Sequence, residues 1–366
     1  MRTAIPLGSR RYGNNILDSP AQRTYIVRMR KNKEAMERTD EPKVPRTLQE
    51  AIVYFADPEI AHAFAVSLRW PDGIFCPFCT CCEYSYISTR KRWKCKGCKK
   101  QYSVRVGTIF EDSPLSLSVW FTAIWMLANC KNGVSSYEIH RALGVTQKTA
   151  WFMLHRIRAA IKAKSFDKKL AGIVEADECF IGGLFKNMHT RRKEKIRAES
   201  DAKGAKTMRG AIGKTLVQAV LERNGDVRAQ IIESTGLDER LSFLLENVEE
   251  GAQLMTDEGY TNTAFDQHFV HEFVNHEVEY VRGNVYTNGV ENFWCLLQRA
   301  IGGTYVSVEP FHLSRYVDEQ AFRFNQRKDN DAGRFVKALA MVPTARLTYK
   351  ELIRAEGEPS PSAERA

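Results

Sequence analysis

The chain has 366 residues and is 43% hydrophobic, which is enough for two or three domains that each bury a core. Its 54 Lys and Arg exceed its 44 Asp and Glu, and the net charge of +10 favours nucleic acid over an acidic membrane surface as the partner. The basic N-terminus lacks the apolar run of a secretory signal, and the most apolar long stretch, 119–130, is too short to span a bilayer. We therefore expect a cytoplasmic protein with no membrane partner.

Polar segments lie at both ends of the chain. Residues 1–46 are rich in Arg and Lys without a sustained hydrophobic period, which predicts a basic flexible arm, and residues 353–366 form a polar tail. Residues 47–55 and 58–70 predict two short helices. Together with the cysteine motif that follows them, these helices make up a predicted domain at residues 47–110.

Four of the nine cysteines follow the spacing C-x2-C, x15, C-x2-C. They are Cys76 and Cys79 in CPFC, and Cys95 and Cys98 in CKGC. Each short knuckle lets two thiolates face one ion, and two knuckles complete a closed tetrahedral site for structural Zn²⁺. Because an intracellular chain favours metal binding over disulfides, this motif predicts a zinc ribbon.

A basic run overlaps the second cysteine pair. Residues 90–105 contain eight Lys or Arg and no acidic residue, and Trp93 and Tyr102 interrupt the run. This mixture suits phosphate contacts together with stacking or packing. The side chains predicted to contact DNA are Arg90, Lys91, Arg92 and Lys94. The alternative is that zinc holds a small module together and the charge is only solvated.

A helix-turn-helix pattern occupies residues 111–165. An apolar helix precedes a short helix around Ile139, a turn at Gly144, and a second helix capped by Thr146. The second helix of such a pair usually enters a major groove. The side chains predicted to face DNA are therefore Gln147, Lys148 and Thr149. An ordinary helical hairpin in a core is the alternative.

Residues 166–352 mix strand-like and helical patterns. The predicted elements are a strand at 173–181, a hairpin of strands at 215–222 and 227–232, a helix at 237–248, a strand at 253–256, a helix at 262–269, a strand at 277–282 and a helix at 287–303. This order is expected of a ribonuclease H-like α/β domain with a mixed sheet. The whole chain is then a multidomain α+β protein.

The interval 184–214 separates the first predicted strand from the hairpin. It carries ten Lys or Arg and three acidic residues without a clear period, which predicts a loop or flexible insertion. We expect Arg191, Arg192 and Lys193 in this insertion to grip the DNA backbone. The alternative is an exposed insertion with no defined role.

Three acidic residues fall at related places in these elements. Asp177 lies in the first strand, Asp257 follows a buried strand, and Glu291 stands near the start of the last helix. Converging carboxylates can hold two Mg²⁺ (or Mn²⁺) ions, which activate a nucleophile and stabilise a leaving oxygen in phosphodiester chemistry. Taken singly, Asp177 could be a lone acid at a strand end, Asp257 a turn cap, and Glu291 part of a capping box with Thr287 or Asn288.

These motifs together resemble the bacterial insertion-sequence transposases of the DDE type, which carry an N-terminal zinc ribbon before a ribonuclease H-like core. The resemblance covers roughly residues 50–352. It is carried by CPFC with CKGCKKQYSVRVGTIF, by EADECFIGG, by TDEGY, by TNGVENFWCLLQRAIGGTY and by HLSRYVDEQAFRFNQR. It implies that Asp177, Asp257 and Glu291 are the catalytic and metal-binding triad.

The resemblance also implies a function. The ribbon and the helix-turn-helix would recognise the element's terminal inverted repeats, and the catalytic domain would cleave the strands at the element ends and transfer them to target DNA. Because two ends are handled together, we expect a homo-oligomer on double-stranded DNA, associated with the nucleoid when bound. The alternatives are a non-enzymatic DNA-binding regulator with a degenerate catalytic domain and a nuclease without strand transfer.

One position departs from the family pattern. Such proteins commonly carry a Lys seven residues after the catalytic Glu, where this chain has Gln298 followed by Arg299. Seven residues are two helical turns, so Gln298 lies on nearly the same stripe as Glu291. Arg299 is rotated by about 100° from that stripe. We expect Gln298 and Arg299 to contact DNA, with Gln298 supplying hydrogen bonds but no charge.

Overall fold

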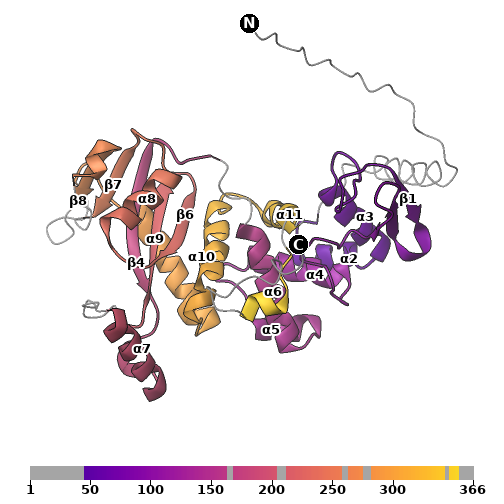
Figure 1. Cartoon of the computed structure of the whole chain (residues 1–366), viewed down its shortest axis with the longest axis horizontal. Coiled ribbons are helices and arrows are strands. Elements are labelled where there is room, and N and C mark those ends of the chain that lie inside the picture. The colour runs from indigo at the N-terminus through magenta and orange to yellow at the C-terminus, as the bar shows by residue number, and fades with distance from the viewer. Residues whose placement is uncertain are drawn as a thin grey trace, which may run out of the picture. The chain divides into compact units, whose positions relative to one another are not determined.

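The computed structural model describes residues 45–162, 168–203, 212–257, 263–274, 282–342 and 346–353 (Figure 1). Its contacts group into two units. One contains Gly73–Ser103, and the other contains Pro45–Asp72 and the described chain from Val104 onward. The predicted arm lies outside the described residues apart from Pro45 and Arg46, and the predicted tail lies outside them apart from Ile353.

The smaller unit is a three-stranded antiparallel sheet. Its strands are β1 (Tyr84–Ile87), β2 (Arg92–Cys95) and β3 (Gln101–Tyr102), in the order β1-β2-β3, with the short 3-10 helix η1 (Ser88–Arg90) between β1 and β2. Side chains alternate along β2, so Arg92 and Lys94 are exposed while Trp93 is buried. Trp93 stacks on Tyr102 with 5.9 Å between ring centroids, and both are buried. Of the two roles weighed for these aromatic residues, the structure shows packing.

The larger unit contains a helical part formed by segments far apart in the sequence. Its helices are α2 (Leu48–Tyr54), α3 (Pro58–Arg69), α4 (Leu117–Asn129), α5 (Ser136–Leu143), α6 (Gln147–Lys162), α11 (Asp331–Met341) and α12 (Tyr349–Ile353). Phe55 after α2 contacts Phe121 of α4 and Phe335 of α11, at centroid distances of 4.8 and 5.8 Å. Aromatic burial of this kind joins the start and the end of the chain in one core.

The two helices α5 and α6 form where the sequence predicts them. The Ser135 hydroxyl accepts from the Glu138 N–H, and the Glu138 carboxylate accepts from the Ser135 N–H, which is a capping box at the start of α5. Gly144 ends α5 with φ 66°, a left-handed conformation that suits glycine. The Thr146 hydroxyl then accepts from the Thr149 N–H at 3.2 Å and caps α6.

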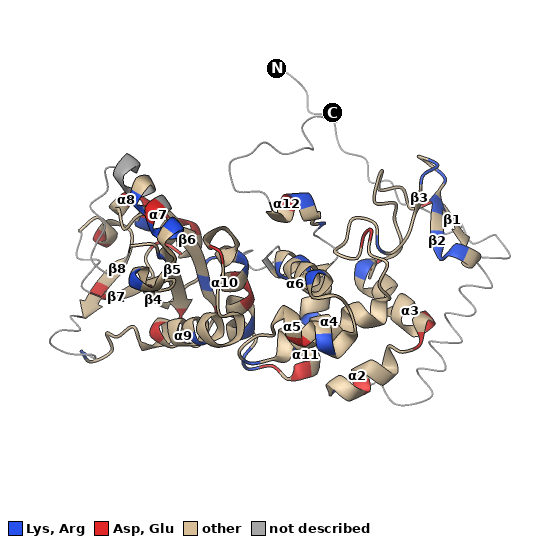
Figure 2. Ribbon diagram, turned by 90° about the horizontal axis from the view of Figure 1, so that it is seen from below, with Lys and Arg blue, Asp and Glu red and all other residues tan. Residues whose placement is uncertain are grey.

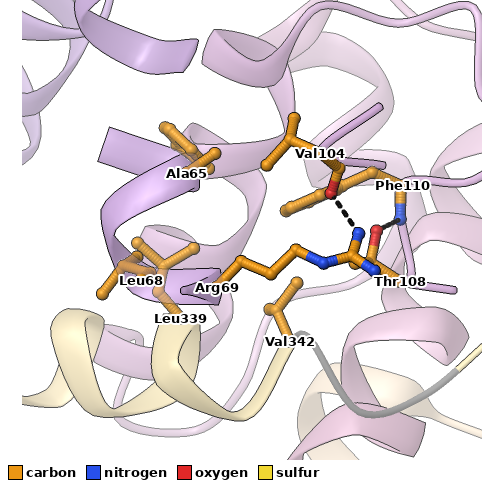
Figure 3. A pocket seen from close by; sticks show the side chains of 9 residues that line it. Ala65, Leu68, Arg69, Val104, Thr108, Phe110, Leu339 and Val342 are labelled. Atoms are coloured by element: carbon orange, nitrogen blue, oxygen red, sulfur yellow. Dashed lines mark hydrogen bonds between the residues drawn. The ribbon is translucent and has the colours of Figure 1, made fainter. Parts of the chain in front are cut away.

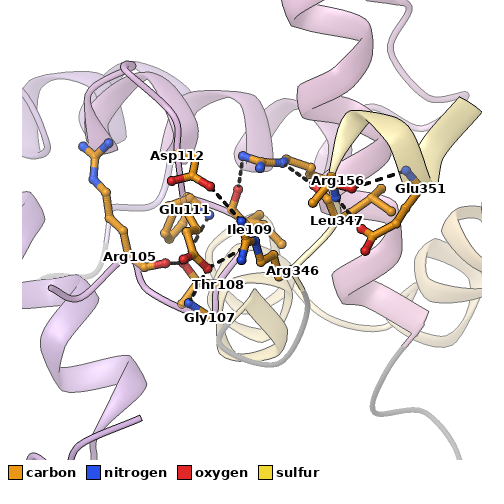
Figure 4. A network of polar contacts seen from close by, with 12 residues as sticks. Arg105, Gly107, Thr108, Ile109, Glu111, Asp112, Arg156, Arg346, Leu347 and Glu351 are labelled. Atoms are coloured by element: carbon orange, nitrogen blue, oxygen red, sulfur yellow. Dashed lines mark hydrogen bonds and ion pairs between the residues drawn. The ribbon is translucent and has the colours of Figure 1, made fainter. Parts of the chain in front are cut away.

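Two arginines, the half-buried Arg69 and the buried Arg156, bind backbone carbonyls of irregular segments that lie against these helices. Arg69 at the end of α3 donates to the Val104 carbonyl at 2.7 Å, beside Thr108 and Phe110 (Figure 3). The cavity at this place has a volume of about 10 Å³, close to the minimum for one water molecule, so it is not a ligand site. Arg156 of α6 donates to the carbonyls of Ile109 and Leu347 at 2.8 and 2.9 Å (Figure 4).

The second part of the larger unit is a five-stranded mixed sheet in the order β6-β5-β4-β7-β8. Its strands are β4 (Ile173–Ile181), β5 (Thr215–Glu222), β6 (Val227–Ile232), β7 (Gln253–Asp257) and β8 (Val270–Val274). β5 is antiparallel to β4 and β6, whereas β7 is parallel to β4 and β8. The bounds of β4, β5 and β6 match the predicted strands.

Helices cover both faces of this sheet (Figure 1). On one face, α8 (Leu237–Asn247) packs Phe243 and Leu244 on Val174 and Val220. On the other, α9 (Asn288–Arg299) and α10 (Pro310–Asn325) pack on β5 and β6, and the core there includes Phe293. α9 continues into a π-helical segment, η5 (Ala300–Tyr305). The three layers bury the apolar residues of both strand faces.

The prediction that 184–214 is a loop or flexible insertion was wrong. A 3-10 turn, η2 (Phe185–Asn187), leads into a helix, α7 (Thr190–Lys203), and residues 204–211 lie outside the described chain. The sequence TRRKEKIRAESDAK has no hydrophobic period, yet nearly all of its residues are good helix formers. A polar helix of this kind has no apolar stripe for a periodicity search to find.

The prediction of a helix at 262–269 was also wrong. The described part of that range holds only the 3-10 turn η4 (Phe265–Gln267), after which β8 adds a parallel strand beside β7. β8 was missed because most of its side chains are exposed at the sheet edge, which weakens the alternation of polar and apolar residues. The strand predicted at 277–282 lies outside the described residues except for Arg282, which bridges to Val285.

None of the described helices is long and apolar enough to cross a membrane by itself. α2 and α3 together have the length and the apolar composition of a membrane-spanning segment, but the pair is bent by 104°.

A buried charge cluster joins α6 to α10. Arg158 of α6 and Glu319 of α10 are 1% and 0% exposed, and the Arg158 Nε lies 2.5 Å from the Glu319 carboxylate. Arg323 and the Tyr305 hydroxyl also donate to Glu319. Burial opposes ionisation of this carboxyl, but Arg158 and Arg323 outweigh burial and hold the pKa of Glu319 well below its usual value.

Glu319→Gln should lower the free energy of unfolding by about 3–5 kcal/mol, because it leaves the buried Arg158 and Arg323 without a counter-charge. Denaturant titration measures the change. Lys337→Gln is the matched control, since Lys337 is 52% exposed and its pair with Asp329 spans 3.0 Å. The control should cost at most about 1 kcal/mol. An equal cost for both variants would contradict a structural role for the buried cluster.

Candidate active site and metal centre

The four predicted zinc ligands come together in the ribbon. The Sγ atoms of Cys76, Cys79, Cys95 and Cys98 all lie within 4.8 Å of one another. The Cys76–Cys98 and Cys79–Cys95 sulfur distances are 3.7 and 3.6 Å. A tetrahedral ion with Zn–S bonds of about 2.3 Å requires sulfurs about 3.8 Å apart. The cluster therefore fits structural Zn²⁺.

A fifth cysteine lies beside this cluster. The Glu83 N–H donates to the Cys81 Sγ at 3.4 Å, and a Cβ at Gly97 would lie 3.3 Å from the same sulfur. Within the described residues, Cys81 is not among the grouped sulfurs. It therefore provides a matched comparison for the four ligands.

Asp177 and Asp257 lie side by side on parallel strands. β4 pairs with β7 so that Glu175 stands opposite Met255. Continuing this register by two residues places Asp177 opposite Asp257. Side chains two residues apart share a face, so Asp177 projects on the same face as Glu175 and Cys179, as predicted from the sequence.

The Asp177 carboxylate is closely held. Its Oδ1 accepts from the Glu178 N–H at 2.7 Å, and its Oδ2 accepts from the Trp294 indole N–H at 2.9 Å. Burial and, next in importance, the neighbouring Asp257 carboxylate raise the pKa of Asp177 to about 7. A bound cation would stabilise the ionised form of this buried Asp177 carboxylate beside a second acidic side chain.

Glu291 stands in the first turn of α9, three residues before Trp294. The Thr287 hydroxyl donates to the Glu291 Oε1 at 3.1 Å. In a capping box, by contrast, the N-cap oxygen accepts from the backbone three residues on. Among the described contacts of α9, the N-cap residue Thr287 makes no such side-chain capping bond.

The three carboxylates differ from the cysteine cluster in how tightly they converge. Within the described residues, the four cysteines are the only group of three or more potential ligand atoms that all lie within 4.8 Å of one another. A two-ion site is less demanding, because oxygens bound to different ions can lie up to roughly 8 Å apart. The donor set of three carboxylates, two of them adjacent, suits Mg²⁺.

Trp294 is a residue of this site that the sequence motifs do not reveal. It is 5% exposed, and most of its surface lies in the apolar core beside α9. Its indole N–H nevertheless bonds Asp177. The sequence feature that could have placed Trp294 in the site is its three-residue interval from Glu291, because residues three apart lie near one side of a helix.

The residues predicted to face DNA from α6 all have partners within the chain. Gln147 donates to the Ser136 hydroxyl at 2.9 Å, and the Thr149 and Thr146 hydroxyls lie 2.8 Å apart. The Lys148 ammonium lies 4.9 Å from the centre of the Tyr349 ring of α12. Lys148 is exposed, whereas α6 is largely buried from Met153 onward. Only the first turns of α6 are accessible.

The other predicted DNA contacts occupy three places. Arg90, Arg92 and Lys94 are exposed on the ribbon and Lys91 is half-buried. On α7, Arg191 is exposed, Arg192 pairs with Glu309 at 3.4 Å, and Lys193 donates to the Lys186 carbonyl. On α9, Arg299 is exposed and the Gln298 amide donates to the Cys179 sulfur at 3.1 Å. Gln298 thus faces the strand that carries Asp177.

Two known domain families match the chain. Residues 169–325 match the ISXO2-like transposase domain, and residues 57–101 match the transposase zinc-ribbon domain. The chain thus carries two domains found in insertion-sequence transposases. The matched DDE domain contains all three carboxylates, and the ribbon match contains all four zinc ligands. The family resemblance inferred from the sequence motifs is confirmed, and it indicates DNA as the partner.

A relative from a mobile element supports the same family. The chain is 26% identical over 252 residues to "Uncharacterized protein in transposable element ISH50" of Halobacterium salinarum. The aligned region covers 67% of this chain and 83% of that protein. No solved structure matches the chain.

Cys95→Ser should remove bound zinc from the purified protein, because three thiolates no longer close a tetrahedral site. Cys81→Ser should keep the wild-type zinc content. Elemental analysis of the two variants measures the difference. Zinc retained by the first variant, or lost from the second, would show that the ligand set is assigned wrongly.

Asp177→Asn should stabilise the metal-free protein at neutral and higher pH. Asp177 has a folded-state pKa of about 7 against an ordinary value of 3.8, so its ionisation makes folding less favourable as the pH rises through that window. One pKa unit corresponds to about 1.4 kcal/mol, so we expect a gain of roughly 1–4 kcal/mol at about pH 8 and no gain below about pH 4. Urea unfolding in chelator at several pH values tests this. Parallel stability curves for variant and wild type would refute it.

Proposed function

We propose that this protein is a metal-dependent DNA transposase that binds the terminal inverted repeats of an insertion sequence and catalyses strand cleavage and strand transfer. The observation that carries the proposal is the proximity of Asp177 and Asp257 on adjacent parallel strands, with Glu291 in the first turn of a helix that packs on the same sheet. The match to a transposase domain indicates cleavage and joining of DNA as the reaction class. The three carboxylates would bind the metal ions that this reaction requires.

Asp177, Asp257 and Glu291 would hold two Mg²⁺ (or Mn²⁺) ions. When bound, such ions supply activation of the attacking hydroxyl and stabilisation of the leaving oxygen. The chain itself orients the ligands. Trp294 fixes one oxygen of Asp177, the sheet register fixes the spacing of Asp177 and Asp257, and the Glu178 N–H holds the second Asp177 oxygen.

The sheet supports a ribonuclease H-like assignment of the catalytic domain. Numbered by their order in the chain, its strands lie in the order 3-2-1-4-5, with the second antiparallel to its neighbours. The first strand carries Asp177 and the fourth ends at Asp257. Carboxyl ends of parallel strands are where α/β sheets commonly place their sites.

Several basic surfaces support DNA as the substrate. Arg92 and Lys94 project from the exposed face of β2, and α7 follows the carboxyl end of β4; Lys and Arg are coloured blue on both elements in Figure 2. Arg191 and Arg197 are exposed on α7. Basic side chains beside an active site bind phosphates without reading sequence. We propose that α7 grips the DNA backbone in this way.

The pair α5 and α6 supports a helix-turn-helix role in repeat recognition. The accessible first turns of α6 carry Gln147, Lys148 and Thr149, and the N-terminal residues of a recognition helix are the ones that contact base edges. Because both element ends must be cleaved and joined, we propose a homo-oligomer that assembles on DNA in the cytoplasm. Gln298 and Arg299 would position the strand next to Glu291.

The test mixes the purified protein with DNA that carries the element's ends, in Mg²⁺ or in chelator. We expect nicking and joining only in Mg²⁺, and we expect Asp177→Asn and Glu291→Gln to abolish both while keeping DNA binding. Glu249→Gln is the control, because Glu249 is an exposed carboxylate that precedes the opposite end of β7. Gel assays of binding, nicking and joining measure the outcome.

Each other result selects a different function. Binding without nicking in Mg²⁺ would identify a DNA-binding regulator with a degenerate catalytic domain. Nicking without joining would identify a nuclease. Loss of DNA binding in the Asp177 and Glu291 variants would point to a structural role for these residues.

A further inference from the structure

A second acidic residue of β4 lies under α9. Glu175 stands two residues before Asp177 on the same strand face, and its side chain is 1% exposed. A buried carboxylate is unfavourable unless hydrogen bonds and opposite charge compensate it. The contacts of Glu175 show what compensates it and what it holds in place.

One oxygen of Glu175 caps the start of α9. Its Oε2 accepts from the N–H groups of Gly289 and Val290 at 2.7 and 3.1 Å. The first N–H groups of a helix have no partner within the helix, and the positive end of the helix dipole favours a negative charge there. Among the described contacts, the side chain of the N-cap residue Thr287 makes no capping hydrogen bond to α9. Glu175, which lies on the sheet, supplies that cap instead.

The other oxygen is bound to an arginine from the β-hairpin turn. The Arg223 Nε lies 2.9 Å from the Glu175 Oε1. The same guanidinium donates to the carbonyls of Asn284 and Tyr286, each at 2.9 Å, and its carbon lies 3.6 Å from the centre of the Tyr286 ring. Glu175 and Arg223 therefore fix both the chain that enters α9 and its first turn.

The fit at this place requires a glycine. A Cβ on Gly289 would lie 2.6 Å from the Leu221 side chain and 2.7 Å from the Glu175 Oε2. Both distances are too short for real contacts, so a side chain at position 289 would displace the Leu221 and Glu175 side chains or move α9 away from β4 and β5. Glycine at position 289 allows the backbone of α9 to approach the sheet this closely.

We propose that Glu175 is a positioning residue that sets where Glu291 lies relative to Asp177, an inference that rests on the proposed function. α9 is tied to β4 at two points, through Glu175 to Gly289 and Val290 and through Asp177 to Trp294. Glu291 lies between these points on the helix. Glu175 is not itself a metal ligand, because Arg223 occupies one of its oxygens and the helix N–H groups occupy the other.

The opposite face of the sheet offers a matched control. Glu178, also on β4, pairs with Arg240 of α8 at 2.6 Å. The side chains of Arg223 and Arg240 are both 12% exposed. Arg240→Gln therefore breaks a comparable ion pair on the same strand without touching α9.

The experiment compares wild type, Glu175→Gln, Gly289→Ala and Arg240→Gln in the full chain. Calorimetric titration with Mg²⁺ gives the metal affinity, and hydrogen exchange reports opening of residues 287–293. We expect Glu175→Gln and Gly289→Ala to weaken Mg²⁺ binding about tenfold or more, as loss of a residue that orients metal ligands does. Both should speed exchange in the first turn of α9. Arg240→Gln should lower the melting temperature but leave both readouts at wild-type values.

The outcomes separate this inference from the proposed function. If the wild type does not bind Mg²⁺, the carboxylate triad is wrong and the role of Glu175 is overturned with it. If the wild type binds Mg²⁺ and the variants at 175 and 289 bind it equally well, the triad stands and only the positioning role is overturned. If Glu175→Gln does not fold, Gly289→Ala decides the question in the same assay.

Discussion

The parallel pairing of β4 with β7 is the constraint on which the arrangement of the five-stranded part depends. It brings Asp177 and Asp257 to the same level on neighbouring strands, where their charges repel and burial raises the pKa of Asp177. Hydrogen bonds from the Glu178 N–H and the Trp294 indole limit how the Asp177 carboxylate can move. The Trp294 indole N–H donates to one oxygen of Asp177. Glu175, paired with Arg223, binds the start of α9, the helix that carries Glu291.

The sequence predicted most of this arrangement because its signals are local. The strands β4, β5 and β6 alternate or run apolar between clear turns, and the cysteine spacing alone identified the ribbon. α7 and β8 were missed because each is largely solvated, and a solvated element carries no hydrophobic period. The cap on α9 could not be predicted, since Glu175 and Gly289 meet only through the tertiary fold.

The helices that precede the sheet are not an independent module beside it. α6 is buried along most of its length. Its Arg158 pairs with Glu319 of α10, and its Arg156 donates to the carbonyls of Ile109 and Leu347. Phe335 of α11 packs with Phe55 and Phe121, so the last helices of the chain complete the core begun by the first ones. Buried contacts between α6 and α10 therefore join the helical part to the part that contains the five-stranded sheet.

The buried contact of Arg158 with Glu319 has a consequence for the spacing between the DNA sequence that is recognised and the bond that is cleaved. α6 cannot tilt against α10 without separating charges inside the protein, which is costly. Under the proposed function, α10 links the bases read at the start of α6 to the phosphodiester cut beside Asp177, because α10 contacts α6 and also packs on the sheet. The protein would then set the number of base pairs between the recognised sequence and the cleaved bond at the transposon end.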